Sequence, residues 1–342
     1  MAENHTYEDH VWMLKNMPSG PSATWDVTIG ISCLAATLLG FVGNSLAFGY
    51  FHGKKELAPR LYKYLCCIDI VICLCQIPFI QAFLNGRNPG LFDDKIFCNF
   101  WTVVFDISTK FYPMAVLLLS ASRTIAIACP FYGIRKNAVI AVLYIYLFYL
   151  GLRQVGNFLV GFGVIYGADS GYCYSFFDTQ TGTLTHFQNS YRTADYALWS
   201  IETGLPAVLT FISFIVSTIN LLSKPVIPSR QARHRRAAIT ITIFTGVFLF
   251  CYLPIFSLCA LYVCLSTIYK DELGLDSGIF SNYFMFWYSW PLAKCLLNTL
   301  NTTLDVVIYL TCMKDFRKWI RLMTGKQKES VASISSNTVS EL

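Results

Sequence analysis

The sequence predicts an all-α membrane protein built as a bundle of seven transmembrane helices. Of the 342 residues, 55% are hydrophobic and only 13% are charged, an apolar excess that ordinary soluble domains do not carry. The apolar residues gather into seven segments, each near the ~20 residues that a helix needs to cross a bilayer. These segments cover residues 27–51, 61–84, 97–128, 138–165, 195–222, 235–265 and 280–311.

The chain divides into an N-terminal tail, one transmembrane domain and a C-terminal tail. The tail 1–26 is polar and shows no signal-peptide pattern, and Asn4-His5-Thr6 is a glycosylation sequon, so Asn4 favours an extracellular N-terminus. The transmembrane domain covers 27–323. The end of the chain, 324–342, is rich in serine and is expected to be a disordered cytoplasmic tail.

The linkers between the apolar segments alternate in charge. By the positive-inside rule, the basic linkers lie in the cytoplasm, which puts the C-terminus inside and the N-terminus outside a multi-pass protein of the plasma membrane. This one-sided placement of the +6 net charge argues against nucleic-acid binding. The basic side carries Lys54, Lys55, Arg60, Lys63, Arg135, Lys136, Lys224, Arg230, Arg233, Arg235, Arg236, Lys314, Arg317, Lys318 and Arg321.

The third apolar segment begins at Cys98 and ends at Ser122-Arg123-Thr124. An arginine at the end of such a run is expensive in lipid, and alone it would indicate only an interfacial anchor. In rhodopsin-like (class A) G-protein-coupled receptors, however, the third helix starts with a disulfide cysteine and ends in Asp/Glu-Arg-Tyr. Cys98 and Arg123 have the family's separation of twenty-five positions, so the chain resembles this family, although Ser122 replaces the acid and Thr124 the tyrosine.

Further motifs support the resemblance in the later helices. The run Phe248-Leu-Phe-Cys251-Tyr252-Leu253-Pro254 is similar to the family's Phe-x-x-x-Cys-Trp-x-Pro switch, with Tyr252 in place of tryptophan, and Pro206 matches the proline of the fifth helix. Asp305 to Tyr309 stands where the family has Asn/Asp-Pro-x-x-Tyr, but the proline is missing. The resemblance implies an activation switch made of Arg123, Phe248, Tyr252, Pro254, Asp305 and Tyr309.

Two other structural features follow from the same resemblance. It implies a disulfide bond between Cys98 and Cys173, which would tie the third helix to the long external loop 167–194. It also implies a short amphipathic eighth helix, Lys314 to Met323, with Phe316 on the membrane face.

Buried polar residues in the first, second and seventh segments predict a polar network. Asn44 and Asp69 would be costly without partners, so we expect them to meet each other or water. In the family, the positions of Asp69, Asn301 and Asp305 bind an allosteric sodium ion; here Tyr112 stands where serine is usual. The alternative is two carboxylates that share a proton, because like charges disfavour joint ionisation.

Three charges at membrane depth predict a buried cluster. Asp106 and Lys110 are spaced i, i+4 and can pair, and by family register Lys110 faces Glu202. The cluster is read either as the floor of a ligand pocket, favoured for Asp106, or as an ion network that locks the bundle, favoured for Lys110. The residues assigned to the ligand pocket are Phe105, Asp106, Lys110, Arg153, Glu202, Tyr252, Lys294 and Asn298.

The resemblance implies a receptor that binds an extracellular ligand and activates a heterotrimeric G protein by movement of the sixth helix. Phe105 stands where amine receptors have aspartate, and Thr299 where opsins have the retinal lysine, so neither ligand class is favoured; a peptide is preferred over a small organic molecule. No catalytic or metal-binding motif stands out, so we expect neither an enzyme nor a cofactor other than sodium.

Several partners and alternatives remain open from the sequence. Serines of the tail could recruit an arrestin after phosphorylation, and Ser340-Glu341-Leu342 fits a PDZ ligand that adds a strand to a sheet edge. The altered switch residues leave open a chemosensory or non-signalling receptor. A small-solute transporter would also place paired charges at the midplane, but the chain shows no internal repeat.

Overall fold

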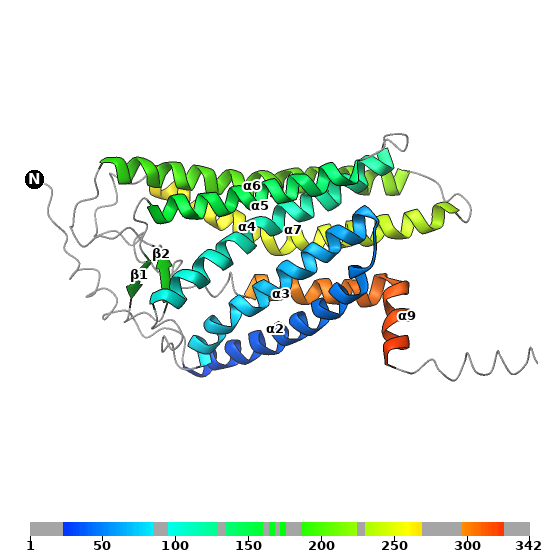
Figure 1. Cartoon of the computed structure of the whole chain (residues 1–342), viewed down its shortest axis with the longest axis horizontal. Helices are drawn as coiled ribbons and strands as arrows, with labels where there is room; N and C mark the ends of the chain where they lie inside the picture. The colour runs from blue at the N-terminus through cyan, green and yellow to red at the C-terminus, as the bar shows by residue number, and fades with distance from the viewer. Residues whose placement is uncertain are drawn as a thin grey trace, which may run out of the picture.

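The structure is a computed structural model that describes residues 23–84, 95–128, 135–159, 164–167, 172–175, 186–223, 230–268 and 296–324. Nearly all of the described residues are helical (Figure 1). In chain order the elements are α2 (Ala23–His52), α3 (Leu57–Leu84), α4 (Lys95–Ala128), α5 (Lys136–Leu159), β1 (Val164–Gly167), β2 (Tyr172–Ser175), α6 (His186–Ser223), α7 (Arg230–Ile268), a helix Leu296–Cys312 and α9 (Lys314–Met323).

The described helices run side by side as a bundle, with the exception of α9, which turns away at one end (Figure 1). Six of them, α2 to α7, are long and apolar enough to cross a membrane. A seventh span is counted if Leu296–Cys312 and α9, which bend by 91° at their junction, are taken together. This set of helices is compatible with a multi-pass membrane protein, as the composition indicates.

Most predicted segments coincide with a helix, but several boundaries were wrong. The fourth segment was expected to run to residue 165, whereas α5 ends at Leu159 and Val164 already begins β1. The linkers 167–194 and 222–236 were expected to be loops, yet α6 begins at His186 and α7 at Arg230. Hydropathy marks only the part of a helix that lies in lipid, while polar turns continue the helix beyond it. Residues 280–295 of the last segment lie outside the described residues.

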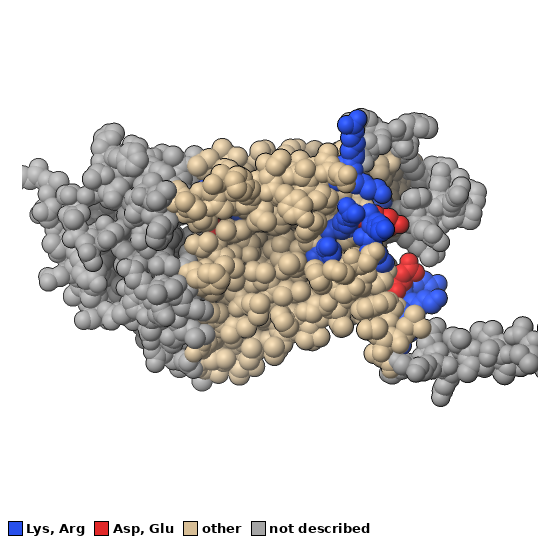
Figure 2. Space-filling model, viewed as in Figure 1, with Lys and Arg blue, Asp and Glu red and all other residues tan. Residues whose placement is uncertain are grey.

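The bundle has two distinct ends. At one end, strands β1 and β2 form an antiparallel hairpin in which Tyr166 pairs with Cys173, and the hairpin contacts α4. At the other end lie α9 and the described surface lysines and arginines, and the described surface between the two ends is largely uncharged in this view (Figure 2). We call these the hairpin end and the basic end; the latter carries Lys54, Lys55, Arg60, Lys63, Arg135, Lys136, Lys314, Arg317, Lys318 and Arg321.

An aromatic core joins the helices near the basic end. Tyr309 is fully buried, and its ring lies 5.8 Å from those of Phe51 and Tyr62 and 6.4 Å from that of Phe244. Phe316 of α9 is 1% exposed and stacks on Trp319. Contacts of Phe316 with Tyr50 and Tyr309 hold the start of α9 against the bundle, while Leu322 and Met323 are exposed on the same short helix.

Candidate functional site

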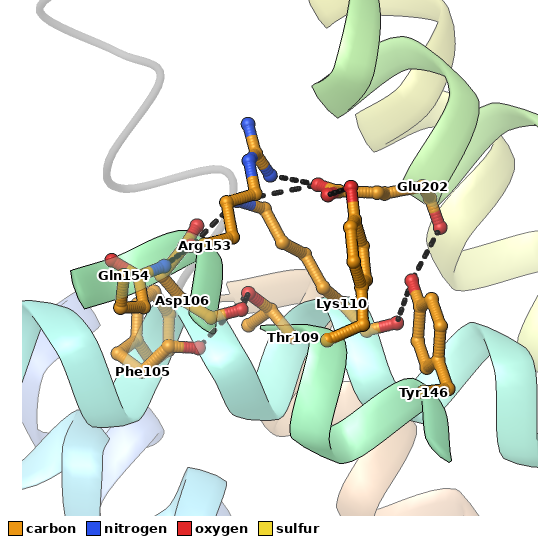
Figure 3. A network of polar contacts seen from close by, with 9 residues as sticks. Phe105, Asp106, Thr109, Lys110, Tyr146, Arg153, Gln154 and Glu202 are labelled. Atoms are coloured by element: carbon orange, nitrogen blue, oxygen red, sulfur yellow. Dashed lines mark hydrogen bonds and ion pairs between the residues drawn. The ribbon is translucent and has the colours of Figure 1, made fainter. Parts of the chain in front are cut away.

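The three charges predicted to cluster are brought together between α4 and α6. The Lys110 Nζ atom lies 2.5 Å from Asp106 Oδ2, one turn earlier on α4, and 3.6 Å from Glu202 Oε2 on α6 (Figure 3). Lys110 and Glu202 are 3% and 4% exposed. The expected contacts of Lys110 with Asp106 and Glu202 are therefore present, and Lys110 and Glu202 are buried while Asp106 is partly exposed.

Glu202 is the centre of this cluster because α5 directs three side chains to it. Tyr146, Tyr149 and Arg153 follow the spacing i, i+3, i+7, so they lie on one face of α5. The Tyr149 hydroxyl donates to Glu202 Oε1 at 2.7 Å, and the Arg153 guanidinium donates to Glu202 Oε2. α5 thus reaches α6 through hydrogen bonds to a single acidic residue.

The third α5 side chain binds the backbone of Glu202. In a helix the carbonyl of residue 202 accepts from the N–H of residue 206, but Pro206 has no N–H. The Tyr146 hydroxyl donates to this carbonyl oxygen at 3.2 Å (Figure 3). An unpaired carbonyl in a membrane interior would be costly, so Tyr146 compensates for the proline in α6.

The charges of the cluster balance. Asp106 and Glu202 supply two acids, and Lys110 and Arg153 supply two bases, so the group is neutral as a whole. Gln154 adds a hydrogen bond from its Nε2 to Asp106 Oδ2. Three of the four charged residues are buried to 8% exposure or less, whereas the Asp106 side chain is 31% exposed. Paired burial of this kind avoids the large penalty of an isolated charge in lipid.

Other residues assigned to the pocket lie elsewhere in the structure. Phe105 stacks on Trp101, with ring centroids 5.1 Å apart, and packs with Cys75 of α3. Tyr252 stacks on Tyr112 at 5.5 Å, deeper in the bundle. Asn298 is 1% exposed, and neither polar atom of its side chain has a hydrogen-bond partner among the described residues. Lys294 lies outside the described residues.

A second group of polar residues forms the core between α2, α3, α4 and the helix Leu296–Cys312. The Tyr112 hydroxyl donates to Asp305 Oδ2 at 2.6 Å, and Asp69 lies fully buried in the same core. Asn44 does not donate to Asp69; its Nδ2 donates to the backbone oxygens of Gly40 and Thr302.

The buried oxygen atoms of this core could serve as ligands of a sodium ion or as acceptors of a shared proton. Within the described part of the chain, Asp69 Oδ1 and Oδ2, Asp305 Oδ1 and Asn301 Oδ1 are buried without a hydrogen-bond donor, as ligands of a cation would be. A proton shared between the Asp69 and Asp305 carboxyls would supply a donor to these oxygens in place of a cation.

Arg123 lies near the basic end, in a recess between α4, α6 and α7. The recess is too narrow to hold a water molecule, and its lining includes Ser217 and Thr245. Ser122, which replaces the family's acid, donates to the Leu119 carbonyl of its own helix at 2.8 Å. Thr124, which replaces the tyrosine, lies 2.8 Å from the Ser213 hydroxyl and 2.7 Å from that of Ser217. These hydroxyls connect α4 to α6.

The remaining switch residues lie on α7 and on the helix Leu296–Cys312. Phe248 is fully buried, and its ring centroid lies 4.7 Å from that of Tyr252. Both residues precede Pro254 in α7. The Tyr309 hydroxyl accepts from Cys66 Sγ at 3.6 Å. The structure thus brings Tyr252 and Phe248 to Tyr112, and through its hydroxyl to Asp305.

Sequence reasoning missed the roles of Tyr112, Tyr146 and Tyr149. Tyr112 was expected to fill part of the polar core, but not to donate to Asp305. The available signal for the other two was their spacing from Arg153 on one face of α5.

The side chains of Cys98 and Cys173, together with Asn4 and the C-terminal tail, lie outside the described residues. No known family model matches the chain, and no curated protein sequence matches it.

Proposed function

We propose that the protein is a rhodopsin-like G-protein-coupled receptor of the plasma membrane, with seven transmembrane helices and α9 as its amphipathic eighth helix. The basic end would face the cytoplasm, in keeping with the positive-inside rule, and the hairpin end would face outside. The N-terminus would then be extracellular and the C-terminus cytoplasmic.

The observation that carries this proposal is the narrow recess around Arg123. It lies near the basic end, and helices α4, α6 and α7 all contribute to its lining. Pro254 interrupts the hydrogen bonding of α7 above it, which makes a hinge. Movement of α7 about this hinge would open the recess and expose Arg123 to a heterotrimeric G protein. An agonist would bias such a two-state bundle toward the open form.

The charge cluster is the proposed ligand site. It lies on the hairpin side of the polar core and joins α4, α5 and α6, so contacts made there act on three helices at once. A peptide remains the preferred ligand over a small organic molecule. Pro206 follows Glu202 by one turn, which places a second hinge beside the site.

Basal activation of G proteins in cells tests the proposal before any ligand is known. We would compare the wild type with Arg123→Ala across the main G-protein subtypes, with Lys55→Ala at the basic end as the matched control. A basal signal that Arg123→Ala abolishes and Lys55→Ala preserves is the expected result. A signal that is the same in all three proteins at equal surface expression would contradict the role of Arg123.

A receptor that binds a ligand without signalling is the second candidate, favoured by the contacts of the Ser122-Arg123-Thr124 triplet. Ser122 bonds to its own helix, and no acid adjoins Arg123 in the triplet. Surface-expressed protein that is silent in every G-protein assay, yet binds an extracellular ligand, would support this candidate. Net uptake of a solute into cells would instead indicate the transporter.

A further inference from the structure

The acids of the charge cluster differ in how far they can be reached. Glu202 is 4% exposed and is bound by Lys110, Tyr149 and Arg153. The Asp106 side chain is 31% exposed, while both bases lie at 8% exposure or less. A ligand that approaches the cluster therefore meets a carboxylate first, with the positive charges behind it.

The position of Lys110 adds a second observation. Its ammonium lies between the two acids, 2.5 Å from Asp106 and 3.6 Å from Glu202. The lysine stem has four flexible carbons, so the ammonium can change its closer partner without movement of the backbone. Arg153 and Tyr149 hold Glu202 in place, and Glu202 therefore remains available to Lys110.

We infer that Asp106 binds a cationic group of the ligand, an ammonium or a guanidinium, and that this binding transfers Lys110 from Asp106 to Glu202. The inference deepens the proposed receptor function and rests on it for the identity of the site as a ligand site. An anionic ligand is disfavoured, because it would have to pass Asp106 to reach the buried bases. A neutral ligand would leave the pairing of Lys110 unchanged.

The exchange has a direct route to α6. Glu202 precedes Pro206 by one turn, and its backbone carbonyl is bound by Tyr146 in place of the missing N–H. A closer ammonium at Glu202 changes the forces on α6 at the point where its hydrogen-bond ladder is interrupted. The cation at Asp106 is thereby coupled to a hinge.

A binding experiment on the full chain in lipid nanodiscs tests the inference with benzylamine as the cationic probe. Benzyl alcohol and benzoate serve as the neutral and anionic probes of similar size. We expect benzylamine to raise the thermal unfolding midpoint in a saturable manner, and the other two probes to leave it unchanged. Asp106→Asn should weaken the benzylamine response at least tenfold, while Asp106→Glu and the distant control Asp315→Asn should preserve it. Equal responses to amine and alcohol, or an unaltered response in Asp106→Asn, would overturn the inference.

A second variant keeps the test decisive if Asp106→Asn does not fold. Gln154 already donates to Asp106 Oδ2, so Gln154→Lys places an ammonium where the ligand cation is expected. This variant should lose the benzylamine response, whereas the neutral control Gln154→Met should keep it; a full response in Gln154→Lys would overturn the inference. These readouts measure binding only. Cation binding at Asp106 without any G-protein signal would contradict the receptor proposal alone, and a signal without cation binding would contradict the inference alone.

Discussion

The hydroxyl of Tyr146 on α5 lies 3.2 Å from the backbone carbonyl oxygen of Glu202 on α6, the carbonyl that Pro206 leaves without its helical donor. Tyr146 also lies 3.5 Å from the carbonyl oxygen of Lys110, so one hydroxyl is shared by the backbones of both ion-paired residues. The missing hydrogen-bond donor in α6 and the Tyr146 side chain on α5 thus form one structural unit. This unit joins the backbones of α4 and α6, the two helices that carry Lys110 and Glu202.

The first prediction is that the effects of Tyr146→Phe and Pro206→Ala are coupled. Tyr146→Phe alone should lower the free energy of unfolding by about 0.6 kcal/mol, the average for a hydrogen bond inside a membrane protein. Pro206→Ala restores the N–H, so Tyr146→Phe in that background should cost less. Thermal unfolding of the four proteins in nanodiscs measures the coupling. Strictly additive effects would show that the hydroxyl does not compensate for the proline.

Much of the charge cluster could be predicted from the sequence, because charges in apolar helices must pair. The spacing of Asp106 and Lys110 and the register of Glu202 suffice to bring these three residues together. The tyrosines could not be assigned in the same way. A tyrosine in an apolar segment is equally typical of a membrane interface, and the sequence does not state which carbonyl lacks a donor in the folded bundle.

The helix ends and the packing of the last helix could not be predicted for a different reason. Polar turns such as those after His186 and Arg230 are compatible with both helix and loop, and only their continuity with a buried helix decides between them. The absence of the family's proline at Val306 is visible in the sequence. The packing of Val306 against Gly43 depends on how closely the two helices approach each other, which a single sequence does not specify.

The second prediction concerns the carboxyl pair. We expect Asp69 and Asp305 to share one proton, so Asp305→Asn should be at least as stable as the wild type, because its amide supplies the donor permanently. Asp305→Ala should be less stable, since it leaves the buried Tyr112 hydroxyl without its acceptor. Unfolding midpoints in sodium chloride and in N-methylglucamine chloride should agree. A midpoint that rises saturably with sodium, and only when Asp69 is present, would establish an ion instead.

The third prediction is that Thr124 holds α4 to α6 near the basic end. Thr124→Val keeps the shape but removes a hydroxyl that lies within 2.8 Å of both Ser213 and Ser217. We expect a loss of about 1 kcal/mol in the free energy of unfolding, because buried hydroxyls on α6 lose a partner. Thr218→Val is the matched control, since within the described part of the chain the Thr218 hydroxyl donates a hydrogen bond to the Phe214 carbonyl of its own helix and not to a neighbouring helix. Equal losses in the two variants would contradict the role of Thr124 between helices.

The fourth prediction tests the close approach of α2 to the helix Leu296–Cys312. A Cβ atom at Gly43 would lie 2.2 Å and 2.5 Å from the two γ-carbons of Val306 and 2.9 Å from its Cβ. Valine has a stiff side chain, so Gly43→Ala requires the two helices to separate. Overpacking of this kind typically costs about 1–3 kcal/mol.

Gly151→Ala provides the control for this fourth prediction, because no described residue has an atom within 4 Å of a Cβ at that position of α5. It should be neutral or stabilising, since alanine is favoured over glycine in a helix by about 1 kcal/mol. In Gly43→Ala/Val306→Ala the two γ-carbons are gone while the contact with Cβ remains, so we expect a partial rescue. Thermal unfolding of the three variants beside the wild type makes the comparison. If Gly43→Ala and Gly151→Ala behave alike, the helices do not meet at Gly43, and Val306 does not occupy the space that glycine leaves.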